Sequence, residues 1–340
     1  MDYLFGKTLL EISEIVKSLK LPIYTAKQIT DWLYKKRAGS INEMTNLSLK
    51  TREALASNYE LGLSAPCNVQ ISFDGTKKYL FKTDLSNYIE SVYIPEYDRA
   101  TLCVSSQAGC RMGCHFCMTA RQGFQQNLSS TEILNQVCST PESNKLSNLV
   151  YMGMGEPLDN IGEVLKSLEI ITSDYGFGWS PKRVTVSSIG ILPNLKRFLD
   201  DSKCHLAISL HNPFDEERQK LMPMQKAYPI AEVINLIKQY DFTGQRRVSF
   251  EYIMFKGLND SDHHANAIAC LLKGLECRLN LIRFHPIPDS ELAGSDEKII
   301  NRFKVLLNSK GILTTIRASR GLDILAACGM LSTKEINIRK

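Results

Sequence analysis

Hydrophobic residues in the first part of the chain recur at helical spacing. Ile29 and Leu33 fall on one face of a helix predicted over residues 25–36, and a second helix is predicted to start at Ser48. The pattern ends at a proline. Residues 1–66 are therefore expected to form a small helical module.

The hydrophobic period then changes to two. Residues 68–83 contain two alternating runs on either side of Asp74 and Gly75, which predicts a β-hairpin. Residues 88–95 are expected to add another strand to the same small sheet. Residues 67–98 are therefore interpreted as a β extension.

After this extension, strand-like runs alternate with helical ones. The strand-like runs are TLCVSSQ, NLVYMGMG, RVTVSS, HLAISLH, VSFEYIM and LNLIRF, with a seventh short run, LTTIRA. Alternating β and α segments predict an α/β fold with a parallel sheet, here an open or partial (βα)6-type barrel. In such barrels the active site lies at the carboxyl ends of the strands.

The segments that follow these runs are rich in polar residues and glycine. Cysteines follow the first run, and GMGEP, SS, SLH, FKGLND, RFHP and RASRG occur at or just after the others. Each segment alone is ordinary for a loop. Because the carboxyl ends of parallel strands meet at one edge, seven such segments together indicate a site there.

The loop after the first run carries Cys110, Cys114 and Cys117 in the spacing C-x3-C-x2-C. Thiolates are soft ligands that suit zinc, copper and iron–sulfur clusters. A zinc ribbon needs a second C-x-x-C pair, which the sequence lacks. Three thiolates on a cubane iron–sulfur cluster leave one iron free to bind a substrate. A Cys3His zinc site that uses His115 is the alternative at this point.

Composition is that of an ordinary soluble protein, with 44% hydrophobic and 23% charged residues. No run is long or apolar enough to cross a membrane, so a cytoplasmic location without a membrane partner is expected. The ten cysteines are then expected to be reduced thiols, ligands or redox groups. The net charge is only +5, so a nucleic-acid partner would need local clusters such as Lys35–Arg37, Lys182–Arg183 and Arg246–Arg247. For each cluster taken alone, a solvated surface is the favoured interpretation.

These motifs together resemble one family. The cysteine spacing, with an aromatic residue before the third cysteine, is similar to that of the radical S-adenosylmethionine (SAM) superfamily. The wider context TLCVSSQAGCRMGCHFCMTARQGFQQNL resembles the RNA adenosine C2-methyltransferases within it. The likeness continues through VYMGMGEPLDN, AISLHNPFDEERQKLMP, YIMFKGLND and RASRGLDILAACG. It implies a radical SAM core barrel over residues 99–331 and a C-terminal tail over residues 332–340.

The resemblance implies methylation of carbon 2 of an adenosine in 23S rRNA and of the tRNA adenosine just 3′ of the anticodon. It implies one [4Fe-4S] cluster on the three cysteines and two SAM molecules per turnover. One SAM would methylate Cys328, and the second would yield the radical that activates this methyl group. Cys103 would resolve the resulting RNA–protein crosslink through a transient disulfide with Cys328, and Glu90 would accept a proton. A cytosolic reductant or electron donor would complete the cycle.

The same resemblance implies a set of SAM-binding residues at the strand ends. They are Gly155, Glu156, Ser187, Ser209, Leu210, His211 and His285. Three positions depart from the family pattern. His285 stands where asparagine is usual, Ile189 changes the usual segment STSG to SSIG, and Met330 stands where glutamine is common. None of the three is a cluster ligand or one of the two catalytic cysteines.

Several alternatives remain open. Carbon 8 of adenosine is a rival target for the same cysteines, and a non-catalytic iron–sulfur RNA-binding protein or a zinc-stabilised barrel would carry the same loop. The local sequence alone favours a buried apolar role for Cys328, a core-facing position for Cys103 and a solvated strand position for Glu90.

RNA is the partner that the resemblance implies, and a flipped base could enter a barrel mouth. Trp32, Tyr34 and Lys35–Arg37 in the helical module are candidate stacking and backbone contacts. Trp32 fits the core of that module equally well.

Overall fold

A computed structural model describes residues 2–242, 244 and 248–333, so the Arg246–Arg247 cluster lies outside the described residues. Within these residues the main sheet has ten strands in the order β14-β13-β12-β11-β10-β9-β6-β5-β4-β3. Seven neighbouring strands in it are parallel. They are β6 (Ala100–Cys103), β9 (Asn148–Tyr151), β10 (Val184–Ser188), β11 (His205–Ser209), β12 (Val248–Met254), β13 (Cys277–Arg283) and β14 (Leu313–Ile316).

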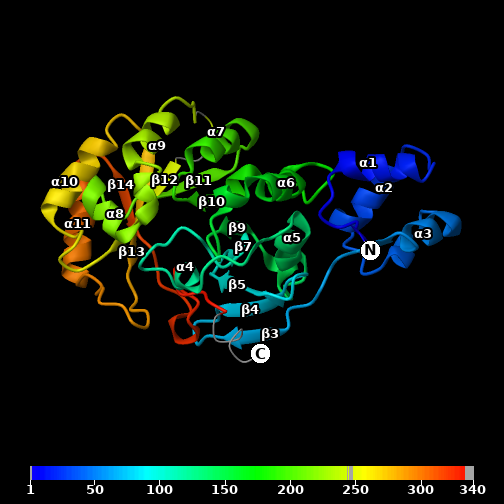
Figure 1. The fold of residues 1–340 in the computed structure, drawn as a ribbon, viewed down its shortest axis with the longest axis horizontal. Coiled ribbons are helices and arrows are strands. Elements are labelled where there is room, and N and C mark those ends of the chain that lie inside the picture. Colours follow the sequence, from blue (N-terminus) through cyan, green and yellow to red (C-terminus); the bar gives the residue numbers. More distant parts are fainter. Residues whose placement is uncertain (1, 243, 245–247, 334–340) are drawn as a thin grey trace.

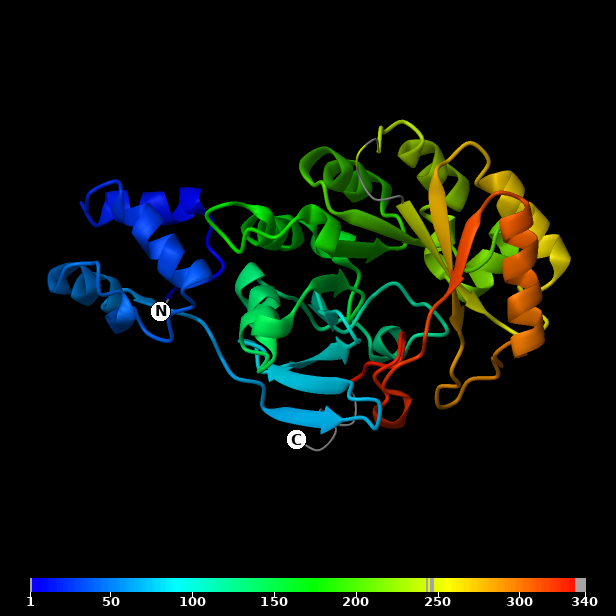
Figure 2. The same cartoon turned by 180° about the vertical axis from the view of Figure 1, so that it is seen from behind.

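Helices cover the outer face of this curved parallel sheet (Figures 1 and 2). They are α5 (Ser130–Cys138), α6 (Ile161–Thr172), α7 (Leu192–Asp201), α8 (Asp215–Leu221), α9 (Ile230–Ile237), α10 (Asp262–Leu271) and α11 (Glu297–Ser309). Each longer helix follows from an amphipathic run. In α7, for example, Leu195 and Phe198 are buried while charged residues face outward. The predicted α/β barrel is confirmed, and the seventh strand-like run forms β14.

The β extension consists of β3 (Asn68–Ile71), β4 (Lys77–Lys82) and β5 (Tyr88–Pro95). β3 and β4 form the predicted hairpin, in which Asp74 and Gly75 make the turn. The third strand pairs with the hairpin as predicted, and β5 also pairs with β6, which joins the extension to the barrel sheet. Both faces of β5 are therefore largely buried.

The N-terminal module contains α1 (Leu9–Ser18), α2 (Thr25–Thr30) and α3 (Leu49–Ala56), and α2 continues as a π-helical turn over Asp31–Lys35. It lies at one end of the molecule beside α5 and α6 (Figure 1). Thr131 of α5 donates from Oγ1 to the carbonyl of Phe5 at 2.7 Å, which fixes the module to the barrel.

Short elements complete the described chain. They are β1 (Asp2–Tyr3), β2 (Tyr59–Glu60), β7 (Gln107–Ala108), β8 (Gln126–Asn127), α4 (Met118–Gln122) and 3-10 turns at Ile41–Glu43, Ser143–Lys145, Pro157–Asn160, Pro181–Arg183, Pro223–Lys226 and Leu322–Ile324. No helix in the described part of the chain is long and apolar enough to span a membrane.

Candidate active site

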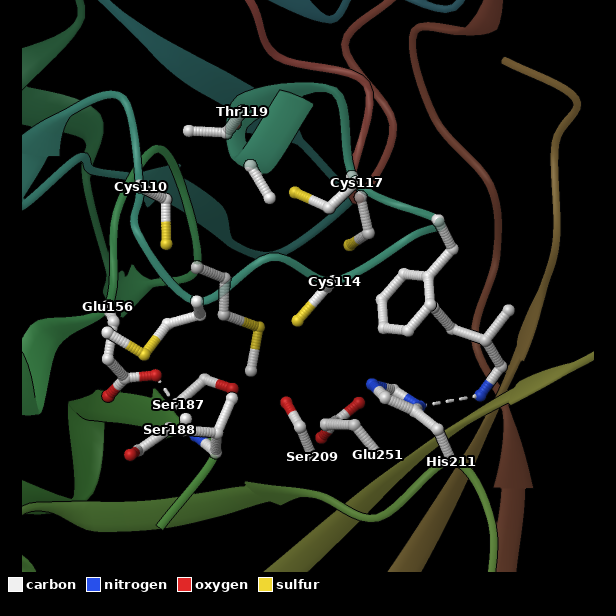
Figure 3. Close-up of a pocket in the computed structure, with 18 of the residues that line it drawn as sticks. Cys110, Cys114, Cys117, Thr119, Glu156, Ser187, Ser188, Ser209, His211 and Glu251 are labelled. Carbon is white, nitrogen blue, oxygen red and sulfur yellow. Dashed lines mark hydrogen bonds between the residues drawn. The ribbon is translucent and has the colours of Figure 1, made fainter. Parts of the chain in front are cut away.

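A cavity lies at the carboxyl ends of the parallel strands, where the sequence placed the site. It encloses about 910 Å³ of empty space, part of which is open to solvent. The three loop cysteines line it from one side, and polar residues from β10, β11 and β12 line it from the other (Figure 3). The sequence-predicted residues that line it are Cys110, Cys114, Cys117, Gly155, Glu156, Ser187, Ser209, His211 and Cys328.

The cysteine loop is closed at its base by a short antiparallel ribbon. β7 pairs with β8, so the chain enters and leaves the loop at one point. At this neck Gly109 has φ +71°, and a Cβ there would lie 1.7 Å from the carbonyl oxygen of Gly123. Only glycine permits this approach, which closes the loop and holds its three thiols over the cavity.

The three thiols are soft ligands that line one cavity together. Burial raises the pKa of Cys110 to about 12 and raises those of Cys114 and Cys117, so each thiol would lose its proton on binding metal. Among the described residues, no group of three His, Cys, Asp or Glu side chains is arranged to hold one metal ion. His115 is exposed and does not line the cavity, so the Cys3His zinc alternative has no support in the geometry.

Gly155 and Glu156 follow β9 and form the cavity wall opposite the loop. Gly155 has φ +99°, and a Cβ on it would lie 2.5 Å from the Gln107 side chain. The Glu156 carboxylate accepts from the backbone N–H groups of Leu158 and Ile189, each at 3.0 Å. Burial raises its pKa to about 7. A fixed carboxylate of this kind can accept hydrogen bonds from an ammonium group in the cavity.

His211 follows β11, and its backbone and ring are both held by contacts. Its backbone is left-handed at φ 52°, and its Nδ1 accepts from the backbone N–H of Ile253 at 3.1 Å. Its ring meets Phe116 edge to face at 4.9 Å. Burial lowers the pKa of His211 to about 3, so the neutral ring keeps its proton on Nε2 at pH 7. Ser187 and Ser209 offer hydroxyls to the same space (Figure 3).

Two of the expected SAM residues do not line this cavity. Leu210 is fully buried, and its backbone N–H donates to the carbonyl of Glu251 at 3.0 Å. His285 lines a neighbouring hollow of about 1990 Å³ and shares a hydrogen bond of 2.7 Å with the Ser319 hydroxyl. Cys328 lines both spaces and marks where they meet.

Cys328 is exposed on a loop that is tied to the cysteine loop. The Met118 N–H donates to the Gly329 carbonyl and the Thr119 hydroxyl donates to the Leu331 carbonyl, both at 2.7 Å. The buried role that local sequence favoured for Cys328 is therefore wrong. Cys103 is buried in β6, as its strand pattern indicated. Burial, reinforced by the nearby Cys328 thiol, raises the pKa of Cys103 to about 12.

Glu90 is not the solvated strand residue that its local sequence favoured. It is buried in β5, and its carboxylate pairs with Lys78 Nζ at 3.0 Å. It also accepts from the backbone N–H of Ser332 at 3.0 Å, beyond the Cys328 loop. Burial raises the pKa of Glu90, and Lys78 opposes this rise. Glu90 does not line the thiol cavity itself.

Sequence reasoning missed two charged residues at the boundary of the two hollows. Arg317 Nη1 lies 3.3 Å from Glu251 Oε2, and the Asn280 amide donates to Glu251 Oε1 at 2.8 Å. Both charged residues line both spaces. The signal was present, because VSFEYIM and LTTIRA each place one charge in an otherwise apolar or neutral strand run.

The helical module exposes only some of the residues that were expected to contact RNA. Tyr34 is 1% exposed and donates its hydroxyl to the Lys7 carbonyl at 2.5 Å, so its prediction as an RNA stacking residue was wrong. Tyr34 is buried because its ring packs against another aromatic ring in the core of the module. Trp32 is half-buried, with Lys36 Nζ 3.9 Å from its ring centroid, while Lys35 is exposed.

Comparisons with known proteins agree over almost the whole chain. The sequence model of the Radical SAM superfamily matches residues 104–267, and that of the Ribosomal RNA large subunit methyltransferase N-terminal domain matches residues 3–61. Proteins named "Probable dual-specificity RNA methyltransferase RlmN" are similar at 60% identity in Phocaeicola vulgatus, covering 97% of this chain and 95% of that protein. In Porphyromonas gingivalis the identity is 55%, with 98% and 97% covered.

A solved structure shares the fold. The crystal structure of a radical SAM methyltransferase from Sphaerobacter thermophilus has a TM-score of 0.91 at 38% identity. The match covers 97% of this chain and 99% of that one. The likeness therefore includes the N-terminal module and the β extension as well as the barrel.

Proposed function

Because this chain belongs to the RlmN-type dual-specificity RNA methyltransferases of the radical SAM superfamily, we propose that it methylates carbon 2 of adenosine. The proposed substrates are 23S rRNA and tRNA, the latter at the position 3′ of the anticodon. Carbon 2 lies between two ring nitrogens and is electron-poor, so it is a poor nucleophile toward a sulfonium methyl group. One observation carries the proposal: Cys328 opens into the cavity that the three loop thiols line.

Cys110, Cys114 and Cys117 would hold a [4Fe-4S] cluster, which the superfamily implies together with SAM. When bound, this cluster supplies the electron that cleaves SAM. Glu156 would accept from the SAM ammonium group, and Ser187, Ser209 and His211 would contact its polar atoms around the cavity. Two SAM molecules would be used in each turnover.

Cys328 would carry the methyl group, and one hydrogen atom of this group would pass to the 5′-deoxyadenosyl radical derived from the second SAM. The remaining S–CH2 carbon would bond to carbon 2 of the base, and the adduct would lose one electron to the cluster. Glu90 would accept the proton that leaves carbon 2. The Cys103 thiolate would then attack the Cys328 sulfur, so that an S–S bond forms as the sulfur–methylene bond breaks. The released electron pair would stay on the methylene carbon, which would take up one proton to become the product methyl group. A cytoplasmic thiol reductant would restore both thiols with two electrons and two protons.

RNA would reach this cavity from the surface next to the helical module. Residues 1–66, with exposed Lys35 and half-buried Trp32, would contact the RNA, and residues 67–98 would brace the Cys328 loop. Residues 99–331 would form the catalytic barrel. Residues 332–340 would form a tail, of which 334–340 lie outside the described residues.

The cysteine roles predict opposite outcomes for two substitutions. Cys103→Ala should accumulate RNA covalently attached to the protein, because the crosslink forms but is not resolved. Cys328→Ala should form no adduct. Cys270→Ala, which changes an exposed cysteine on α10, is the matched control and should behave as wild type. Absence of any adduct from Cys103→Ala would favour a non-catalytic RNA-binding protein.

The methylated atom needs a separate measurement. RNA from a strain that lacks the gene, treated with the purified protein, should gain 2-methyladenosine by mass spectrometry against authentic standards. Gain of 8-methyladenosine alone would overturn the carbon 2 assignment while leaving the cysteine roles intact.

A further inference from the structure

Arg218 on α8 is the largest fully buried side chain among the described residues, with 1% exposure. Its guanidinium donates to the carbonyl oxygens of Leu210 at 2.9 Å and Ser209 at 2.7 Å. It also donates to the side-chain carbonyl of Gln225. All of these acceptors are neutral. Among the ion pairs of the described residues, none includes Arg218.

A buried cation without a carboxylate partner is unusual, because burial removes hydration that neutral acceptors restore only in part. The nearest acid on α8 is separated from the guanidinium by an intervening amide, since the Gln225 amide donates to Asp215 Oδ1 at 2.6 Å. Burial lowers the pKa of Arg218 to about 10, so the group stays charged at pH 7. The fold therefore maintains a positive charge at this place with no carboxylate from the described part of the chain in direct contact.

Besides Asp215, the cysteine loop is a second source of negative charge, and it contacts α8. The end of α8 touches that loop, because the Leu221 carbonyl accepts from the backbone N–H of His115 at 3.0 Å. Ser209, a hydrogen-bond partner of Arg218, lines the same cavity as Cys114. Ser209, whose carbonyl Arg218 binds, lies below Cys114 in the view of Figure 3.

Three thiolates and a [4Fe-4S] core carry net negative charge, and that charge grows when the core gains an electron. A fixed cation nearby stabilises the reduced form more than the oxidised form. We propose that Arg218 is a positioning residue that favours electron uptake at the three-cysteine site by placing a permanent positive charge behind Cys114. This inference rests on the proposed cluster site.

A purely structural role is the competing explanation, since the same hydrogen bonds join β11 to α8. Charge and hydrogen bonding are separated by three substitutions. Arg218→Gln keeps donors but loses the charge, Arg218→Met loses both, and Arg218→Lys keeps the charge without the forked geometry. Lys220→Gln removes an exposed charge from the same helix and is the matched control.

The measurement is the midpoint potential of the anaerobically reconstituted full-length protein, followed by electron paramagnetic resonance. Thermal unfolding of each apoprotein shows whether it folds. At a fixed potential, both neutral variants should have about a tenfold lower ratio of reduced to oxidised cluster than wild type. Arg218→Lys and Lys220→Gln should stay within about twofold. Loss of the cluster from folded neutral variants, with retention in Arg218→Lys, would support the same conclusion.

Unchanged potentials in the neutral variants would overturn the inference and leave the proposed function standing. Equal shifts in all three Arg218 variants, or a failure of all three to fold, would assign Arg218 a structural role instead. A wild-type protein that binds no iron and sulfide would overturn the proposed function and this inference together.

Discussion

Lys78 on β4 and Glu90 on β5 form a buried ion pair. The substitution Lys78→Met measures what this pair contributes to the free energy of unfolding. The two side chains are 9% and 7% exposed, and their charged atoms are 3.0 Å apart. Removing one partner of a buried pair costs about 3 to 5 kcal/mol when the other charge stays behind. Glu90 limits this cost by taking up a proton, so we expect about 3 kcal/mol at pH 7.5.

The cost should depend on pH in one direction. Without Lys78, the pKa of Glu90 in the folded protein rises further above its unfolded value, so the folded variant binds the extra proton. Its stability is then greatest at low pH and is lost as pH rises through the folded pKa. At about 1.4 kcal/mol per pH unit between the unfolded and folded pKa values of Glu90, the destabilisation should be smaller at pH 5.5 than at pH 7.5 by up to about 2.8 kcal/mol.

Urea denaturation of the apoprotein at pH 7.5 and 5.5 measures both quantities. Lys77→Met is the control, because Lys77 pairs with Glu142 from a position that is 32% exposed and should cost only about 0 to 1 kcal/mol. The double variant Lys78→Met/Glu90→Gln should recover part of the loss. If Lys78→Met proved as stable as wild type, or equally destabilised at both pH values, the reasoning about the buried pair would be refuted.

Two further substitutions test the cavity wall at Gly155 and the loop that carries Cys328. Gly155→Ala should weaken SAM binding in calorimetry and destabilise the fold by about 2 kcal/mol, because its φ is +99° and its Cβ would lie 2.5 Å from a neighbouring side chain. Gly162→Ala is the control, because its Cβ would meet nothing within 4 Å, and it should change neither SAM binding nor stability in this way. Equal behaviour of the two variants would contradict the argument from the backbone of Gly155. Asp323→Asn should loosen the loop that carries Cys328, because Asp323 accepts a hydrogen bond from the Ser72 hydroxyl at 2.5 Å. Alkylation of the Cys328 thiol should then become several-fold faster. An unchanged alkylation rate would show that this contact does not hold the loop.

The barrel and the cysteine loop were accessible from the sequence because local patterns determine them. Each parallel strand is a compact apolar run followed by a distinctive loop, and Asp74-Gly75 marks its hairpin directly. Pairing of β5 with β6 was not accessible in the same way, because an alternating strand does not reveal how many neighbours it has. The burial of Tyr34 likewise depends on residues distant in the chain.

The partners of the site residues were the least predictable feature. Glu90 could be named from a motif, but its pairing with Lys78 depends on the register of β4 against β5. Arg218 stands in the polar run DEERQK and has the sequence character of a solvated helix residue. Packing of α8 against the end of β11 makes it a buried cation. Long-range contacts decide both cases, and no local period encodes them.

The measurement that tests the central claim most directly is SAM cleavage by the anaerobically reconstituted protein. Given a low-potential reductant, SAM and RNA, wild-type protein should release 5′-deoxyadenosine, and Cys114→Ala should release none. Cys270→Ala, remote from the cavity, should match wild type. If wild-type protein with bound iron and sulfide left SAM intact under these conditions, the account of the three-cysteine cavity as a radical SAM site would be contradicted.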